Sequence, residues 1–210
     1  LNHAGFAQPA IDSTGNGLVY WREADIPQDG WNLAESGHVS VRSRSSAGVV
    51  NSVEQLSPDG ADAFNTAVET RTKTIAFTPG GGAMAAWSGF DGSEFRIYVA
   101  LMNASGTWGS PVPISAAGQN AKLPRISVGE NGVIAVSWQR SDGVKNRVQA
   151  SVYDPFADQW APAVSLSSAG ESAYWSDISF DGGGKFTALW SRFDGSNYKI
   201  ESKQVTIASP

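Results

Sequence analysis

Three copies of a Trp-x-x-x-Asp-Gly segment carry the side chains best suited to recognise a polar ligand. The copies are WSGFDG at 87–92, WQRSDG at 138–143 and WSRFDG at 190–195. Carboxylate and guanidinium groups hydrogen-bond to sugar hydroxyls, and aromatic faces stack on pyranose rings. The pattern therefore predicts a ligand-binding rim that contains Asp91, Asp142, Asp194, Arg140, Arg192, Phe90 and Phe193.

The same residues also have a purely structural interpretation. Asp before Gly is favoured by turn geometry alone, because its side chain hydrogen-bonds to the backbone of the turn. Arg beside Trp is also typical of a structural cation–π pair. A longer copy, WREADIPQDGW at 21–31, adds Arg22 and Asp29 to the set. The sequence leaves both interpretations open.

Tyr174 and Trp175 are the strongest individual candidates for contact with a ligand. They lie in the segment ESAYWSD at 171–177, where the corresponding segments read NAKLPR and DAFNTA. The pattern shared by the copies does not require aromatic residues there. A role in binding is therefore a simpler explanation for this pair than for the recurring residues.

Composition excludes several classes of protein. The chain has 210 residues, a net charge of −5 and only 17% charged residues, so the basic footprint of a nucleic-acid binder is missing. No apolar run approaches the ~20 residues that span a bilayer, so no membrane insertion is expected. There is no cysteine, which excludes disulfides and thiol nucleophiles.

The elements that position these residues recur with a fixed period. Trp87, Trp138 and Trp190 are 51 and 52 residues apart, and Trp108 and Trp160 are also 52 apart. Similar segments precede each first Trp: KTIAFTPGGGAMAAW, PRISVGENGVIAVSW, SDISFDGGGKFTALW and, more distantly, PAIDSTGNGLVYW. The segment NTAVETR at 65–71 reads as an insertion in the second unit. A period of this length indicates a repeat architecture.

Each unit reads as a series of strands. Apolar residues alternate, and Gly-rich turns separate the alternating runs. Asn-Gly and Asp-Gly favour hairpin turns in which both central residues have positive φ. In the third unit we expect strands at 124–128, 133–139, 146–153 and 160–166, and almost no helix anywhere.

Antiparallel four-stranded units of this length are typical of the blades of a β-propeller. We therefore predict an all-β fold, a single β-propeller domain over residues 1–210. It would contain about four four-stranded antiparallel blades, with the last blade incomplete. The approximate blade boundaries are 1–63, 64–121, 122–173 and 174–210.

The sequence also resembles a known group of repeats. LPRISVGENGVIAVSWQRSDG followed by ADQWAPAVSLSSAGESA is similar to the propeller repeats of secreted or surface proteins of environmental bacteria. The resemblance covers nearly the whole chain and extends distantly to sialidases with Asp-box motifs and to propeller lectins. It implies an extracellular or cell-surface location and says little about activity.

Catalytic signals are sparse. Arg22, Arg140 and Arg192 could imitate the Arg triad of propeller sialidases, but they recur at one position of the repeat, as structural residues do. SFDGGGKF at 179–186 resembles an Asp-box, with Phe186 in place of its Trp. Glycosidases need a pair of carboxylates, and no pair stands out. The two histidines, His3 and His38, are far apart in sequence. We predict no catalytic residue, no cofactor and no metal site.

The phase of the repeat bears on assembly. LNHAGFAQPAI at the start matches LSSAGESAYWSDI at 166–178, and the final KIESKQVTIASP matches a third strand. The chain begins Leu1-Asn2-His3, without an initiator Met or a signal segment, so it is expected to be a processed form or a piece of a longer chain. Three arrangements remain open: a four-bladed ring with one three-stranded blade, a homo-oligomeric ring of two chains, or association with another propeller segment.

The functional prediction is a non-enzymatic binding or adhesion module that recognises a glycan or a surface protein through the Asp-Gly rim. One alternative is a sialidase-like glycoside hydrolase domain. Another is a structural unit that self-assembles through an open blade edge. Fold alone does not choose between them.

Overall fold

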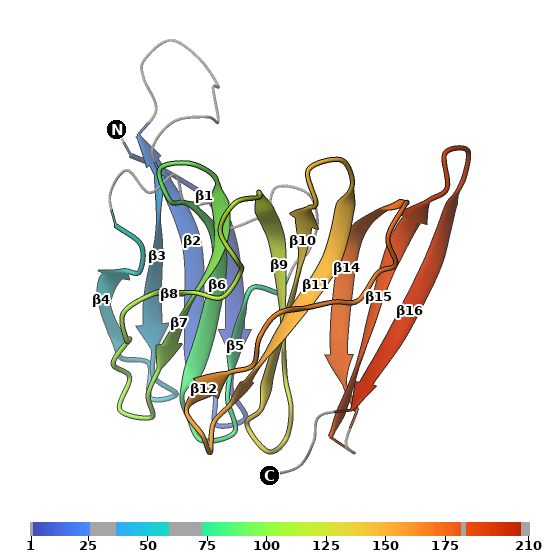
Figure 1. Ribbon diagram of the computed structural model, residues 1–210. Coiled ribbons are helices and arrows are strands. Elements are labelled where there is room, and N and C mark those ends of the chain that lie inside the picture. Colours follow the sequence, from blue (N-terminus) through green and yellow to red (C-terminus); the bar gives the residue numbers. More distant parts are fainter. Residues whose placement is uncertain (1, 26–36, 59–72, 182–183, 207–210) are drawn as a thin grey trace.

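The structure, a computed structural model, describes residues 2–25, 37–58, 73–181 and 184–206. These residues form four antiparallel sheets and contain no helix, and the sheets stand side by side in the order of the sequence (Figure 1). The prediction of an all-β propeller of antiparallel blades is confirmed. The proposed insertion at 65–71 lies outside the described residues.

The strands follow one another as meanders. The first sheet contains β1 (Asn2–Ile11), β2 (Gly17–Asp25), β3 (Gly37–Arg44) and β4 (Val50–Gln55). The second contains β5 (Ile75–Phe77), β6 (Ala83–Phe90), β7 (Phe95–Met102) and β8 (Val112–Pro113). The third contains β9 (Ala121–Val128), β10 (Ile134–Ser141), β11 (Asn146–Asp154), β12 (Gln159–Trp160) and β13 (Val164–Ser165). The fourth contains β14 (Ser172–Phe180), β15 (Lys185–Phe193) and β16 (Tyr198–Thr206).

The outermost strand of the third sheet differs from the prediction. A continuous strand was expected at 160–166, but the structure divides it into β12 and β13, which both pair with β11. Pro162 lies in the gap between them, and proline has no N–H to donate to a strand ladder. The three inner strands of this sheet agree with the expected order and positions.

The backbone angles of the hairpin turns differ from the expectation. In the described pairs Asp91-Gly92, Asn131-Gly132, Asp142-Gly143 and Asp194-Gly195, only the glycine has positive φ, for example 81° at Gly132 and 96° at Gly143. The expectation of positive φ at both central residues is therefore wrong. The Asp and Asn residues keep ordinary backbone angles and act through their side chains instead.

Three hydrophobic clusters hold the sheets together. Each lies between successive sheets and contains one tryptophan of the 51–52-residue period: Trp87 in the first, Trp138 in the second and Trp190 in the third. All three rings are almost fully buried. The expected packing role of these tryptophans is confirmed, and it explains why their spacing marks the blade period.

A serine at the start of each inter-sheet linker hydrogen-bonds to the sheet before it. The Oγ atom of Ser57 accepts a hydrogen bond from the backbone N–H of Val39 at 2.9 Å. Ser115 accepts from Ile97 at 2.9 Å, and Ser167 accepts from Val148 at 3.0 Å. All three serines are buried. Each bond connects the start of an inter-sheet linker to the third strand of the sheet that the linker leaves.

The first strands of successive sheets lie next to one another, with β5 in contact with both β1 and β9, and β9 in contact with β14. The sheets therefore radiate from this common side. Tyr20 bridges two of them, because its hydroxyl donates to the carbonyl of Ala86 at 3.2 Å. Complete burial raises the pKa of Tyr20 well above its usual value. Among the described residues, no core cluster joins the first sheet to the fourth.

Replacing Trp138 by Ala tests the packing argument. Trp138→Ala should lower the free energy of unfolding by about 3–5 kcal/mol, because it opens a cavity between two sheets. Urea unfolding followed by circular dichroism measures the change. The control Phe156→Ala removes an exposed ring and should change stability by less than about 0.5 kcal/mol. Equal effects of the two substitutions would contradict this assignment.

Candidate functional site

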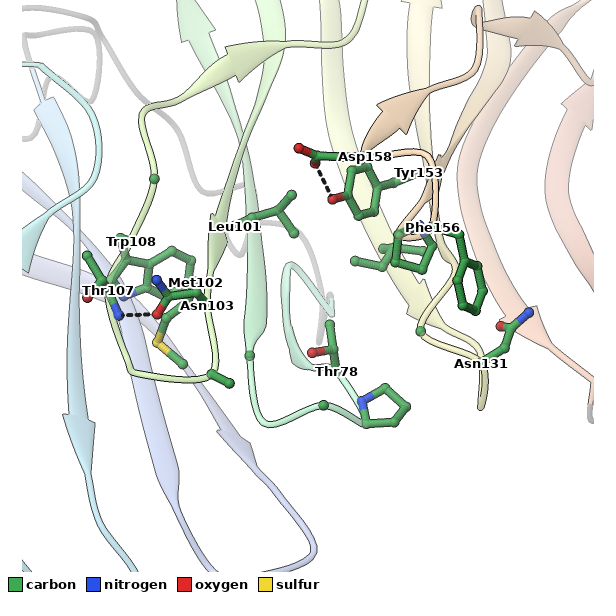
Figure 2. A pocket seen from close by; sticks show the side chains of 18 of the residues that line it. Thr78, Leu101, Met102, Asn103, Thr107, Trp108, Asn131, Tyr153, Phe156 and Asp158 are labelled. Carbon is green, nitrogen blue, oxygen red and sulfur yellow. Dashed lines mark hydrogen bonds between the residues drawn. The ribbon is translucent and has the colours of Figure 1, made fainter. Parts of the chain in front are cut away.

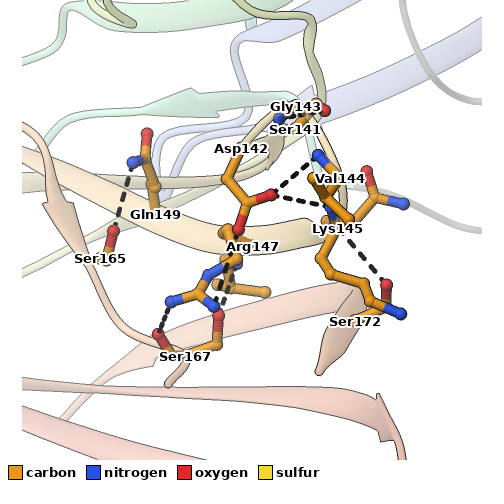
Figure 3. Close-up of polar contacts among 12 residues, drawn as sticks. Ser141, Asp142, Gly143, Val144, Lys145, Arg147, Gln149, Ser165, Ser167 and Ser172 are labelled. Carbon is orange, nitrogen blue, oxygen red and sulfur yellow. Dashed lines mark hydrogen bonds and ion pairs between the residues drawn. The ribbon is translucent and has the colours of Figure 1, made fainter. Parts of the chain in front are cut away.

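The Asp-Gly rim is built from hydrogen-bonded turns, and Figure 3 shows the one in the third sheet. The Oδ1 atom of Asp142 accepts from the backbone N–H groups of Val144 at 3.0 Å and Lys145 at 2.7 Å. These bonds, first that from Lys145, hold the pKa of Asp142 below its usual value. Arg147 lies 3.9 Å from the second carboxylate oxygen and donates to the carbonyl of Ser167 at 3.1 Å.

The other two turns repeat this arrangement. Asp91 accepts from Ser93 and Glu94, both at 3.0 Å, and Asp194 accepts from Ser196 at 3.0 Å and Asn197 at 2.9 Å. In each case one carboxylate oxygen closes the turn. Turn geometry therefore accounts for Asp at these positions. The second oxygen of Asp194 already forms an ion pair with Lys199 at 2.9 Å, so it offers a ligand only its remaining acceptor capacity. Asp29 lies outside the described residues.

The arginines of the rim make separate contacts. Arg140 donates to the carbonyl of Ala117 at 3.0 Å, in the linker from the second sheet to the third. Arg192 forms ion pairs with Glu171 and Glu201. Arg22 is buried in the first sheet. It directly follows Trp21, whereas Arg140 and Arg192 lie two positions after their tryptophans, so the expectation that the three arginines share one repeat position is wrong. Arg140 and Arg192 are thus engaged within their own blade or the adjoining linker.

An aromatic cluster occupies the rim of the fourth sheet. The Tyr198 ring centroid lies 4.8 Å from that of Phe193, 6.0 Å from that of Trp175 and 6.4 Å from that of Tyr174. Trp175 is 49% exposed and Tyr198 is 58% exposed. We refer to these four residues as the aromatic cluster. They form an open apolar surface with polar edges.

A β-bulge positions Trp175. The register between β14 and β15 shifts between Tyr174 and Asp177, and Trp175 has a φ of 50°. Leu123 occupies the equivalent point of the third sheet, where it has a φ of 62° next to a similar shift. The bulge is therefore a property of the repeat, whereas the choice of tryptophan is particular to this blade. A bulge re-aims the side chain that it carries.

Paired charges surround the aromatic cluster. Glu201 and then Glu171 raise the pKa of Arg192, so this guanidinium stays charged. Lys199 lies 2.9 Å from Asp194 and, after the backbone N–H of Asn197, is the next cause that lowers the pKa of Asp194. Ionised donors and acceptors make strong hydrogen bonds to hydroxyl groups. The site thus combines stacking surfaces with charged hydrogen-bonding groups.

The structure brings together part of the predicted set. Five of the predicted residues lie at the rim of the fourth sheet: Tyr174, Trp175, Arg192, Phe193 and Asp194. Phe90 instead pairs with Phe95 in the second sheet at 5.5 Å, with Asp91 next to it. Asp142 and Arg140 belong to the third sheet. Tyr198 was missed, although its place opposite Phe193 follows from pairing across an Asp-Gly turn.

A second hollow, of about 630 Å³, opens at the opposite rim between the second and third sheets (Figure 2). Trp108, Tyr153 and Phe156 line it. The Tyr153 hydroxyl donates to Asp158 at 2.6 Å. Burial and this bond raise the pKa of Tyr153 to about 12. This hollow was not predicted from the sequence; the loop at 154–159, which differs from its counterpart at 103–107, is the signal that could have indicated it.

The described residues contain no group of three or more His, Asp or Glu side chains that could hold a metal ion. The part of the chain that the structure describes also contains no helix long and apolar enough to cross a membrane.

Comparisons with known proteins find similarity in structure only. No protein-family profile and no curated protein matches the sequence. Among solved structures, the chain is similar to a protein of unknown function from Dyadobacter fermentans, with a TM-score of 0.65 and 12% identity over 97% of this chain and 66% of that one. It is also similar to the Hadza microbial sialidase Hz136, with a TM-score of 0.58 and 12% identity over 98% and 46% of the two chains.

A third similar structure is the GH93 α-L-arabinofuranosidase of Fusarium graminearum in complex with arabinobiose, with a TM-score of 0.55 and 11% identity over 96% of this chain and 61% of that one. The chain thus spans about half to two thirds of the length of these three proteins. At such low identity the likeness establishes the propeller fold.

The carboxyl pKa of Asp194 offers a test of the site geometry. A ¹³C NMR titration should give a midpoint below the usual value of 3.8, because folding places two backbone N–H groups and Lys199 beside the carboxylate. The lowered pKa stabilises the fold above pH ~4, and this contribution is lost as the pH falls through the folded-state value. Lys199→Met should raise the midpoint, whereas Lys203→Met should not. An unshifted midpoint in the unsubstituted protein would contradict the geometry.

Proposed function

We propose that this protein is a non-enzymatic glycan-binding module of an exported or surface-exposed protein. The aromatic cluster of the fourth sheet is its binding surface. Saccharide rings stack on Trp175 and Tyr198, and their hydroxyls bond to the charged groups around them. Asp194 and Lys199 contribute at the turn, and Arg192 contributes at the linker side.

The exposure of the aromatic cluster is the observation that carries this proposal. Large aromatic residues are usually buried when their role is packing, as Trp87 and Trp138 are here. Trp175 and Tyr198 instead keep about half of their surface open to solvent while their rings remain in contact. A cluster ordered by its own contacts loses little side-chain entropy when a flat ligand binds.

The similar structures support the choice of ligand class. Two of them carry the names of enzymes that act on glycans, a sialidase and an arabinofuranosidase. The arabinofuranosidase structure contains arabinobiose. This support is by analogy of fold, and the argument for the present chain rests on its own aromatic and charged groups.

The hydrolase alternative finds less support in the described residues. A glycosidase needs a general acid with a raised pKa beside a second carboxylate. The carboxyl groups with clearly shifted pKa values all have lowered ones: Asp12, Asp91, Asp142 and Asp194. Glu171 and Glu201 both form ion pairs with Arg192. Binding therefore remains the proposed activity.

A glycan array followed by calorimetry tests the proposal. The protein should bind one class of glycans, and Trp175→Ala or Tyr198→Ala should weaken binding at least about tenfold, or ~1.4 kcal/mol. The loss follows from removal of the stacking surface. Fluorogenic glycosides measured in parallel should show no turnover.

Phe156→Ala is the matched control for these two substitutions. Phe156 is also exposed and aromatic, but it lines the hollow at the opposite rim. Its removal should leave glycan affinity unchanged. Loss of binding in Phe156→Ala alone would place the ligand in that hollow, and would overturn the assignment to the aromatic cluster.

A further inference from the structure

Every sheet has two different faces, and the interfaces between sheets always use them in the same order. The face that carries the periodic tryptophan packs against the preceding sheet, and the opposite face packs against the following sheet. In the second cluster, for example, Ala86 and Ile97 of the second sheet pack with Trp138 of the third. The first and third clusters follow the same order.

The tryptophan face of the first sheet has no described sheet against it. Val19 is 43% exposed there, although the equivalent residues Ala85, Val136 and Ala188 are fully buried. These residues are equivalent because each lies two positions before the tryptophan of its sheet. Trp21, the counterpart of the three buried tryptophans, lines a hollow of about 720 Å³ on this face together with Val19 and Ile11.

The opposite face of the fourth sheet is open in the same way. Ile200 is 74% exposed, whereas the equivalent residues of the other sheets are fully buried: Val39, Ile97 and Val148. Leu189 is 44% exposed, and its equivalents are also fully buried: Tyr20, Ala86 and Ser137. The four-sheet array therefore ends in two uncovered faces, the tryptophan face of the first sheet and the opposite face of the fourth sheet. These are the two kinds of face that pack together at each interface inside the chain.

Both open faces carry charges of both signs. Arg42 and Arg44 pair across strands with Val19 and Gly17 on the face of the first sheet, and Glu23 lies on the same face. Asp177 lies opposite Leu189 on the face of the fourth sheet, and Lys185 lies on the same face. The choice of partner face therefore rests on the packing order of the sheets and not on net charge.

We propose that two copies of this chain pair head to tail. The open face of the fourth sheet of each copy packs on the tryptophan face of the first sheet of the other, and the pair closes an eight-sheet ring. A head-to-tail contact forms a closed ring where the rotation allows it, and propellers contain up to about eight blades. The contact repeats an interface that the chain already makes three times.

The size of the surface fits a stable pair. A sheet face of three or four strands, each about eight residues long, covers roughly 400 Å² at the usual strand spacing and rise. A closed pair buries four such faces, about 1,600 Å², which is the size of a standard stable interface.

Such pairing would place the first sheet of the second copy next to the aromatic cluster, because Phe193 and Tyr198 lie on the same face of the fourth sheet as Leu189 and Ile200. Between the second and third sheets, the Lys122 ammonium lies 4.2 Å from the centroid of the Phe95 ring. By strand pairing Phe95 corresponds to Tyr198, and Lys122 corresponds to Gly5 of the first sheet. The second copy would thus bring Gly5, which has no side chain, beside Tyr198, at the place where Lys122 covers Phe95.

Molar mass in solution gives the first test. Light scattering and sedimentation equilibrium should give twice the chain mass of 22.1 kDa, without any ligand. Ile200→Asp and Val19→Asp should each shift the protein to the monomer, with at least a tenfold higher dissociation constant. Val144→Asp, at another exposed aliphatic residue, should leave the pair intact. Unchanged circular dichroism confirms that each variant is folded.

Cross-linking tests the order of the faces. The chain has no cysteine, so single cysteines can be introduced without competing thiols. A mixture of Val19→Cys and Ile200→Cys chains should cross-link with a short bismaleimide, whereas neither variant alone should. A monomer at all concentrations overturns the proposal, as do open polymers. Cross-linking of one variant with itself also overturns it, because the contact would then join like faces. None of these outcomes depends on glycan binding by Trp175 or Tyr198.

Discussion

Burial of both faces of every sheet is the constraint on which this structure depends. Each blade is a thin antiparallel layer, so neither face can be stabilised without a neighbouring layer. The tryptophan of each repeat supplies the largest side chain of each interface, and small or branched residues of the adjacent sheet accommodate it. Packing of each tryptophan face on the preceding sheet holds the four sheets in one array. It also leaves one sheet face uncovered at either end of the array. Assembly is therefore part of the same physical argument as the fold.

The rim combines the regular repeat with local departures from it. Asp-Gly turns and the bulge in the first strand occur in several blades, and they fix the backbone there. Function can vary on such a scaffold by substitution at a few positions, without a change of fold. The bulge presents Leu123 in the third sheet and Trp175 in the fourth, where Tyr198 and Phe193 complete an aromatic surface. A binding site on one blade of a repetitive array can therefore arise from a few substitutions on a backbone that the blades share.

The two proposals concern neighbouring parts of one face of the fourth sheet, and separate experiments test them. The aromatic cluster lies at the rim, where side chains meet solvent, and the open face below it presents Leu189 and Ile200. Stacking of a saccharide needs accessible rings, whereas packing of a sheet needs dehydration of aliphatic side chains. A paired ring would bring two such clusters to one assembly, which raises avidity for a ligand with repeated units.

Much of the fold was readable from the sequence, because the alternation of apolar residues and the spacing of Trp87, Trp138 and Trp190 reflect burial, and burial has a fixed geometric period. The sequence also identified Tyr174 and Trp175 as residues that the repeat does not require. Local patterns could not show that Pro162 divides a strand, that Ser57, Ser115 and Ser167 bond to third strands, or that Tyr198 joins the aromatic cluster. Only the tertiary structure decided which faces remain open, because exposure depends on what lies beyond each sheet, and a residue such as Ile200 has the same local sequence context whether it is covered or not.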